Sequence, residues 1–326
     1  MIAAERQAVL ILGMHRSGTS AVAGAANLLG ATAPARMFAP AADNPSGFWE
    51  SAAVVATNNR IMGEAGSSWY DCLGFDCASL DVTARTRALT FIMLSLLSDY
   101  RQGRLLLIKD PRLSLLLDLW LPALQQMKIA PSLLLVLRPP GEVAASLAKR
   151  NALPAAYVTA LWLRHMLAAE YASRGCARHI LIYDALLRDW RGALLRASRA
   201  ATFTWPVSFD AVAQQIPKYL NDQLRHHRTY TSTRQTVGDP LGLWADEVYE
   251  ILYAFSATDG NAHQLERLDS VRAAFWDWCR THQRTWTENV LTGHALRNEL
   301  RIDVPVDWEA AVSRLQLVNP PASLNA

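Results

Sequence analysis

A glycine-containing segment near residue 13 has the residue types and spacing of a phosphate-binding loop. It reads Gly13-Met-His-Arg-Ser-Gly-Thr-Ser20 and lies between an apolar run and a helical pattern. Glycines let backbone N–H groups approach an oxyanion closely, and the N-terminus of the following helix adds exposed N–H groups and a favourable dipole. The segment therefore predicts a cradle for a nucleotide phosphate. A strand-to-helix turn without a ligand is the alternative.

The same segment lacks the lysine of a nucleoside triphosphate loop. Its G-x-x-x-x-G frame is followed by Thr19, where a kinase or ATPase needs a lysine on the β- and γ-phosphates. The basic residue is instead Arg16, two places before Gly18. A 5′-phosphosulfate carries fewer charges and needs no metal, so the pattern favours a phosphosulfate over a triphosphate.

A second anion site is indicated by Arg138, which directly follows another apolar run. Ser146 comes eight residues later, about two turns into the helix that is expected to begin at Pro140. Arginine offers a forked, permanently charged contact to a phosphate, and the serine can add a hydroxyl. Two separated phosphate sites imply a nucleotide with two separated anionic groups. An ordinary strand-end cation is the alternative for Arg138.

Together these segments resemble the sulfotransferases that use 3′-phosphoadenosine 5′-phosphosulfate (PAPS), in the R-S-G-T form typical of bacterial and Golgi-type members. Met14 to Ser20 is similar to the family's 5′-phosphosulfate loop, and the spacing of Arg138 and Ser146 to its 3′-phosphate site. The resemblance implies PAPS as co-substrate with no metal required. It assigns Arg16 to the bridging oxygen and the 5′-phosphate. The loop residues expected to bind the donor are Arg16, Ser17, Gly18, Thr19 and Ser20.

Transfer to a hydroxyl needs a base for the acceptor proton and cations for the charge that develops on the leaving oxygen. Asp43 to Glu50 resembles the N-P-x-G-[FY]-W-E stretch of many bacterial sulfotransferases, and Glu50 is the candidate general base. His15 is a second candidate base. A helix cap or an ion pair with an arginine is the alternative role for Glu50.

Lys109 to Arg112 resembles the K-D-P segment of tyrosylprotein and related sulfotransferases, in which the lysine approaches the transferring group. The resemblance makes Lys109 a second transition-state cation beside Arg16. Asp110 and Arg112 would orient the lysine or hold the acceptor. A strand-end turn with a surface ion pair is the alternative.

Ile182 to Leu187 resembles the family's Y-E-D-L segment, which places Tyr183 near the adenine. Asp184 replaces one acid of that motif and Ala185 the other, but stacking needs only the ring. A core tyrosine is the alternative. The dense basic cluster Leu224 to Arg228 matches no family motif residue by residue, and a solvated basic face is its preferred interpretation.

Four continuous apolar runs must position these residues, because a polar cluster follows each of them. The runs are Ala8 to Leu12, Leu105 to Ile108, Leu133 to Leu137 and Ile180 to Ile182. Runs without polar alternation are typical of parallel strands buried on both faces. The intervening helical patterns are Thr19 to Leu29, Thr83 to Tyr100, Pro140 to Lys149, Ala155 to Ser173 and Ala185 to Ser198.

This alternation predicts an α/β protein with a P-loop-containing three-layer fold, in which a central, mostly parallel sheet is flanked by helices. Ligands bind outside the carboxyl ends of parallel strands, so the four polar ends are expected to form one active site. Residues 1–235 are predicted to form the PAPS-binding domain. Residues 236–326 are predicted to form a helical C-terminal extension on the same domain, which could cover the acceptor or form a homodimer interface.

Composition excludes several other classes of protein. The 326 residues are 51% apolar, enough for a substantial core, and the net charge of +3 is too small for a nucleic-acid-binding arm. The four cysteines show no C-x-x-C spacing and are expected to be reduced thiols. Neither a signal peptide nor an apolar run of ~20 residues is recognised, so a cytoplasmic protein without a membrane span is expected.

The sequence thus predicts a sulfotransferase. Its acceptor is expected to be a carbohydrate, by analogy with bacterial relatives that modify cell-surface glycans, and a peptide tyrosine or a small metabolite is the alternative. A P-loop small-molecule kinase would need lysine in place of Thr19, although Asp110 could imitate its Walker-B acid. A non-catalytic nucleotide-binding partner would depend on Arg138 and Ser146 but not on Glu50 or Lys109.

Overall fold

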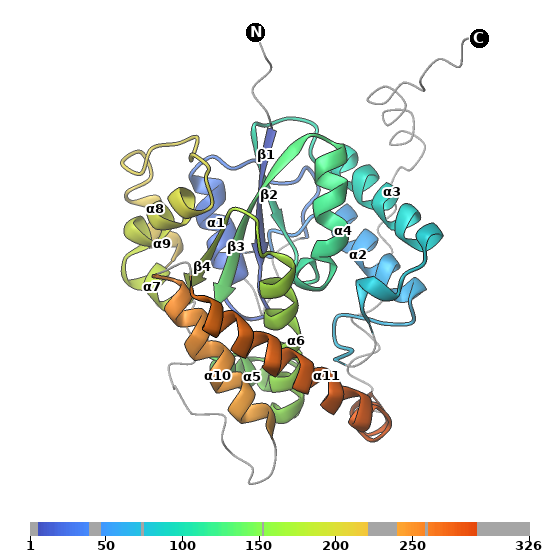
Figure 1. Cartoon of the computed structure of the whole chain (residues 1–326). Helices are drawn as coiled ribbons and strands as arrows, with labels where there is room; N and C mark the ends of the chain where they lie inside the picture. Colours follow the sequence, from blue (N-terminus) through green and yellow to red (C-terminus); the bar gives the residue numbers. More distant parts are fainter. Residues whose placement is uncertain are drawn as a thin grey trace, which may run out of the picture.

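A single parallel sheet forms the centre of the molecule in the computed structural model (Figure 1). The structure describes residues 6–38, 47–72, 75–151, 153–220, 240–257 and 260–291, with side chains except those of residues 151 and 282–291. The strand order is β2-β1-β3-β4, and every neighbouring pair is parallel. The strands are β1 (Arg6–Leu12), β2 (Leu105–Lys109), β3 (Ile129–Leu137) and β4 (Arg178–Ile182). The predicted α/β fold is confirmed.

Strand β3 is longer than its apolar run because pairing with β1 extends it back to Ile129. The added part contains Pro131, a residue that central strands exclude because proline has no N–H to donate. Pro131 pairs with Ala8 of β1, whereas β4 first pairs at Leu133. The proline therefore lies where β3 has a neighbouring strand on one side only.

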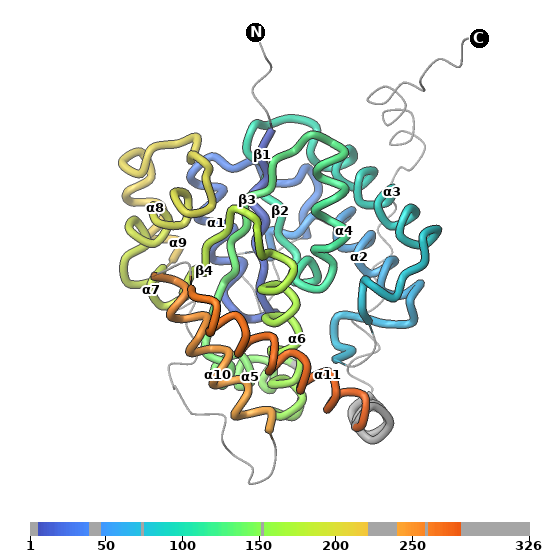
Figure 2. The backbone as a smooth tube through the Cα atoms, in the orientation of Figure 1, coloured from blue at the N-terminus to red at the C-terminus, as the bar shows by residue number. Residues whose placement is uncertain are grey.

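Helices cover both faces of the sheet, as Figure 2 also shows. Alternate residues of β1 point to opposite faces: Leu10 and Leu12 enter one core, and Val9 and Ile11 enter the other. Helices of the first core are α2 (Ala52–Glu64), α3 (Val82–Asp99), α4 (Leu113–Gln126), α5 (Pro140–Asn151), α6 (Ala155–Ala172), α10 (Pro240–Phe255) and α11 (Ala262–Leu291). Helices of the second are α1 (Thr19–Leu28), α7 (Tyr183–Arg188), α8 (Trp190–Ala200) and α9 (Gln215–Tyr219).

Several helices differ from the sequence expectation. The single helix expected over 185–198 is two helices, because Asp189 leaves the helical conformation and its carboxylate accepts a hydrogen bond from Gly192 N at 2.9 Å as the N-cap of α8. Helices α4 and α9 were not predicted, and neither was α2. It begins after Ser51, whose hydroxyl accepts from Val54 N at 3.0 Å.

Helices α10 and α11 lie side by side in Figures 1 and 2. Helix α10 contacts β3 and β4, and α11 packs on α10 and α6. The two helices contribute Leu241, Val248, Leu252 and Phe275 to the first core. The predicted domain boundary near residue 235 lies outside the described residues. The division into a PAPS-binding domain and an extension stays a prediction.

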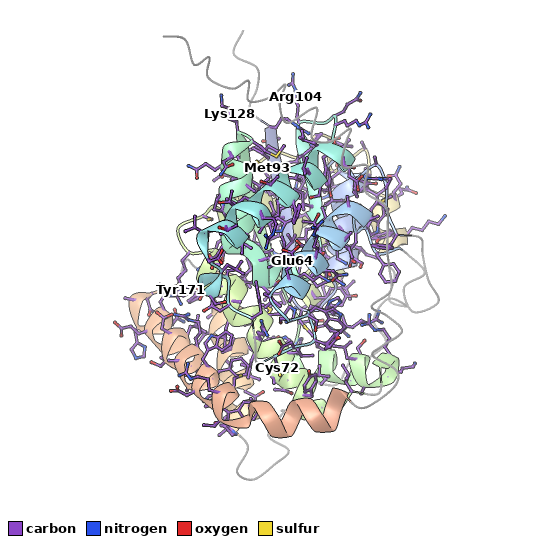
Figure 3. All side chains as sticks on the ribbon, turned by 90° about the vertical axis from the view of Figure 1, so that its right-hand side faces the viewer. Glu64, Cys72, Met93, Arg104, Lys128 and Tyr171 are labelled. Carbon is purple, nitrogen blue, oxygen red and sulfur yellow. The ribbon has the colours of Figure 1, made fainter. Side chains whose placement is uncertain are left out.

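The amino ends of the strands lie away from the glycine loop. Figure 3 shows the exposed Arg104 and Lys128, which precede β2 and β3, together at one end of the molecule, with Cys72 toward the other. All four cysteines are free thiols. Over the part of the chain that the structure describes, no helix combines the length and the apolar character needed to cross a bilayer.

A buried carboxylate ties the start of α2 to α3. Asp99, at the last position of α3, accepts hydrogen bonds from Arg36 Nε at 2.8 Å and from Ser51 Oγ at 2.5 Å. Its side chain is fully buried, so these donors replace water around the charge. Because Ser51 follows Glu50, the contact also fixes the chain that carries the candidate base.

We expect Asp99→Asn to lower the free energy of unfolding by about 1.5–3 kcal/mol, because the amide removes the charge and turns N–H groups toward donors. The measurement is urea denaturation. Asp81→Asn is the matched control: Asp81 caps α3 at an exposed position, and asparagine caps as well as aspartate does. Equal stability losses in the two variants would contradict the anchoring role of Asp99.

Candidate active site

The glycine loop passes closer to its neighbours than a side chain would permit. Gly13 and Gly18 have φ angles of 135° and 91°. A Cβ on Gly13 would lie 2.9 Å from Val136 O of β3, and one on Gly18 would lie 2.2 Å from the Tyr183 ring. Both glycines are therefore required by conformation and by space. Arg16 also adopts a left-handed conformation, at φ 67°.

Contacts within the loop leave the hydroxyl of Ser17 without a partner among the described residues. Gly13 N donates to Ser114 Oγ at 2.9 Å, and Ser17 N donates to Met14 O at 3.1 Å. Ser17 Oγ is buried and has no hydrogen-bond partner among the residues that the structure describes. Buried hydroxyls are normally satisfied, so a bound oxyanion is a reasonable partner for this one. Thr19 is buried and Ser20 is partly exposed at the start of α1.

The structure brings the two predicted anion sites together. Arg16 Nε donates to Ser146 Oγ at 3.0 Å, and Arg138 Nη1 donates to Arg16 O at 2.8 Å. Glu142, one turn into α5, accepts from Arg138 Nε at 3.0 Å and orients the guanidinium. The side chain of Arg16 is thus directed toward α5 and not toward β2.

Tyr183 closes the loop from the side of β4. It is the first residue of α7 and is 2% exposed. Its ring packs against Gly18, and the guanidinium of Arg138 lies 5.3 Å from its centroid. The ring belongs to the second core but borders the Arg16, Arg138 and Ser146 cluster.

A buried ion pair lies on the other side of the loop. Lys109 Nζ, at the last position of β2, donates to Glu50 Oε1 at 2.5 Å and to Phe48 O at 3.0 Å. It also contacts Ser20 Oγ at 3.3 Å. The side chains of Lys109 and Glu50 are only 3% and 11% exposed. Three oxygens therefore stabilise an ammonium that has lost its water.

Asp110, which follows Lys109 in the chain, forms a buried hydrogen-bond network. Its Oδ1 accepts from both the backbone N and Nη1 of Arg112, each at 2.9 Å. Its Oδ2 accepts from Asn58 Nδ2 at 2.9 Å, and Asn58 Oδ1 accepts from Trp120 Nε1 at 3.0 Å. The Asp110 and Arg112 pair is buried, and it links the end of β2 to α2 and α4.

His15 points to a third side of the loop. Its ring centroid lies 4.2 Å from that of Trp69 and 6.4 Å from that of His165. The ring is partly exposed, but Nε2 is buried and has no partner in the described part of the chain. Burial, and next the positive charge of Arg112, lower the pKa of His15 well below its usual value. The imidazole is therefore neutral at pH 7 and is a weak base.

Three residues at the site belong to no motif in the sequence analysis and were not predicted. Glu142 could have been found by its i,i+4 spacing from Arg138. Asn58 and Tyr219 had no sequence signal, because their partners lie far along the chain. Tyr219 accepts a hydrogen bond from Trp49 Nε1 at 2.9 Å and donates one to Ser20 O at 3.0 Å.

Two expected segments fall outside the described residues: positions 43–46 of the Glu50 motif and the basic cluster Leu224 to Arg228. Among the residues that are described, no group of three or more His, Cys, Asp or Glu side chains is placed to hold a metal ion.

Comparison with known proteins finds similarity to a solved structure. No protein-family model and no curated protein matches this chain. Among solved structures, it is similar to the sulfotransferase domain of the olefin synthase from Synechococcus PCC 7002, with 15% sequence identity and a TM-score of 0.43. The match covers 77% of this chain and 97% of that domain. At this identity the similarity concerns the fold alone.

Proposed function

We propose that this protein transfers a sulfuryl group from PAPS to an acceptor hydroxyl, and that the acceptor is a carbohydrate. The supporting observation is the division of charge around the glycine loop. Arg16, Arg138 and Ser146 gather on one side, and the buried pair of Lys109 and Glu50 lies on the other. The first group suits a second phosphate, and the second suits proton removal and charge stabilisation.

The residues present fit a donor with two separated anionic groups. Backbone N–H groups of the loop would hold the 5′-phosphosulfate, together with the Ser17 hydroxyl, which has no partner among the described residues. Arg138 and Ser146 would hold the 3′-phosphate, and Tyr183 would border the adenine. Arg16 joins these contacts through its bond to Ser146. When bound, the donor supplies the sulfuryl group and leaves as 3′-phosphoadenosine 5′-phosphate.

Glu50 is the proposed base. Its Oε1 is bound to Lys109, and its Oε2 accepts no hydrogen bond from the described residues, which leaves one carboxylate oxygen for an acceptor hydroxyl. The proton released when the acceptor oxygen attacks sulfur would pass to this carboxylate. Lys109 would then turn its positive charge toward the leaving oxygen, because its Coulombic attraction to Glu50 weakens as that carboxylate is protonated.

His15 is the weaker candidate base for two reasons. Its lowered pKa means that the imidazole holds a proton poorly at pH 7, since the folded state favours the neutral ring. Its ring contacts are with Trp69 and His165, whereas Glu50 and Phe48 are bound to Lys109. We therefore do not assign the role of general base to His15.

The kinase alternative lacks a residue for the triphosphate. Thr19 stands in the position of the required lysine, and Lys109 is already held by Glu50, Phe48 and Ser20. Asp110 is the only acid suggested for a Walker-B role, and it accepts from Arg112 and Asn58. The geometry thus favours a nucleotide donor other than a magnesium triphosphate.

Arg138→Ala should weaken the binding of 3′-phosphoadenosine 5′-phosphate by about 1.5–3 kcal/mol, because a charged hydrogen-bond partner is lost. Isothermal titration calorimetry measures this change. Arg178→Ala is the matched control, because it also removes an arginine from an ion pair with a buried glutamate, Glu170, but at the amino end of β4. Unchanged affinity in Arg138→Ala would remove the 3′-phosphate assignment.

Glu50→Gln should lower kcat by ~10²–10⁴-fold while leaving nucleotide binding intact, because glutamine can still accept from Lys109 but cannot take a proton. The assay is transfer of labelled sulfate from PAPS to a panel of glycans. His15→Gln should lower kcat far less. The reverse order of the two variants would move the base to His15, and wild-type turnover in both would move the role to water. No transfer by the wild-type protein, with nucleotide binding intact, would favour a non-catalytic nucleotide-binding protein.

A further inference from the structure

Tyr219 links two segments that border the candidate site. It is the last residue of α9, which lies beside α1 (Figure 1). Its hydroxyl accepts from Trp49 Nε1 at 2.9 Å and donates to Ser20 O at 3.0 Å. The two rings meet edge to face, with centroids 6.3 Å apart. One side chain therefore joins the helix that follows the glycine loop to the residue that precedes Glu50.

The backbone of Trp49 needs such a restraint. Its φ angle is 59°, a left-handed conformation that is unfavourable for a bulky residue and persists only where the surroundings impose it. The Trp49 side chain packs against the second core, and its described polar and ring contacts are the hydrogen bond and the edge-to-face contact with Tyr219. The direction in which the chain leaves Trp49 sets the position of Glu50.

The same segment is held from the opposite side by Lys109. Its ammonium donates to Phe48 O at 3.0 Å and to Glu50 Oε1 at 2.5 Å. Ser20 takes part in both restraints, since its Oγ contacts Lys109 and its carbonyl accepts from Tyr219. Residues 48–50 are thus fixed between Lys109 and Tyr219.

The Tyr219 ring packs against α1 at Gly24. A Cβ on Gly24 would lie 2.1 Å from the ring, so the absence of a side chain there makes room for the tyrosine. Partial burial raises the pKa of Tyr219 to about 12. The hydroxyl is therefore protonated at pH 7 and can donate to Ser20 O while it accepts from Trp49. The ring can stay in place when the hydroxyl is removed.

We propose that Tyr219 is a positioning residue for sulfuryl transfer, which acts through Trp49 to hold Glu50 beside Lys109 and the glycine loop. This role rests on the proposed function. It predicts that loss of the hydroxyl affects the chemical step and not nucleotide binding, because Tyr219 bonds to Trp49 and Ser20, whereas Arg138 and Ser146 bond to Arg16.

The test is Tyr219→Phe, with Tyr100→Phe as the matched control. Tyr100 is buried, and like Tyr219 it donates to a backbone carbonyl, Leu107 O at 2.9 Å, but it lies at the end of α3. We expect Tyr219→Phe to lower kcat roughly 10- to 100-fold, because a displaced catalytic group loses alignment. The KM for PAPS and the affinity for 3′-phosphoadenosine 5′-phosphate should stay at the wild-type values. Tyr100→Phe should change none of the three.

Two further variants separate positioning from a general structural effect. In a Glu50→Gln background, Tyr219→Phe should reduce the residual kcat hardly at all, because residues that act as one unit are not additive. Trp49→Phe should reproduce the kcat loss of Tyr219→Phe, and the double variant should be no worse than either. Hydrogen exchange of residues 47–52 should be faster in Tyr219→Phe and unchanged in Tyr100→Phe.

A wild-type kcat in Tyr219→Phe, or an equal loss with and without Glu50, would overturn the positioning role. So would a fall in nucleotide affinity that accounts for the whole loss of activity. If the wild-type protein binds the bisphosphate but transfers no sulfate to any acceptor tested, the proposed function fails instead. In that case, hydrogen exchange still tests whether Tyr219 restrains residues 47–52. Unchanged exchange of these residues in Tyr219→Phe would show that it does not.

Discussion

The rest of the site depends on the passage of the glycine loop between β1 and β3. The chain runs from β1 to β2 on one side and then to β3 on the other, so the direction of the connections reverses between β1 and β3. A crevice forms at such a point in parallel sheets, and the loop turns into it. Contact with Val136 and Tyr183 is close enough to require glycine at positions 13 and 18.

Charged side chains surround the loop, and burying them costs desolvation free energy that other interactions in the fold must offset. Three ion pairs with largely buried partners follow β2 and β3: Lys109 with Glu50, Arg112 with Asp110, and Arg138 with Glu142. Desolvation makes such pairs poor sources of stability compared with apolar residues of similar size. Their concentration at one edge of the sheet is explained more readily by a need for fixed charge near a ligand than by a need for stability.

Local patterns predicted much of this arrangement. Continuous apolar runs located the four strands, and Pro140 and Ala155 marked the starts of α5 and α6. The eight-residue spacing of Arg138 and Ser146 placed both beside the loop, since one ends a strand and the other lies two turns into the next helix. The restraints on Glu50 could not be predicted in this way. They come from Lys109, Asp99 and Tyr219, which reach it only through tertiary packing.

Titration of the wild-type protein with 3′-phosphoadenosine 5′-phosphate in the absence of metal, and separately with Mg-ATP, tests the central claim most directly. Calorimetry measures both affinities. The site described here predicts tight, metal-independent binding of the bisphosphate and weak binding of Mg-ATP, because two anion sites are present and the triphosphate lysine is replaced by Thr19. Preference for Mg-ATP, or binding of neither nucleotide, would contradict the assignment of the loop to a sulfuryl donor.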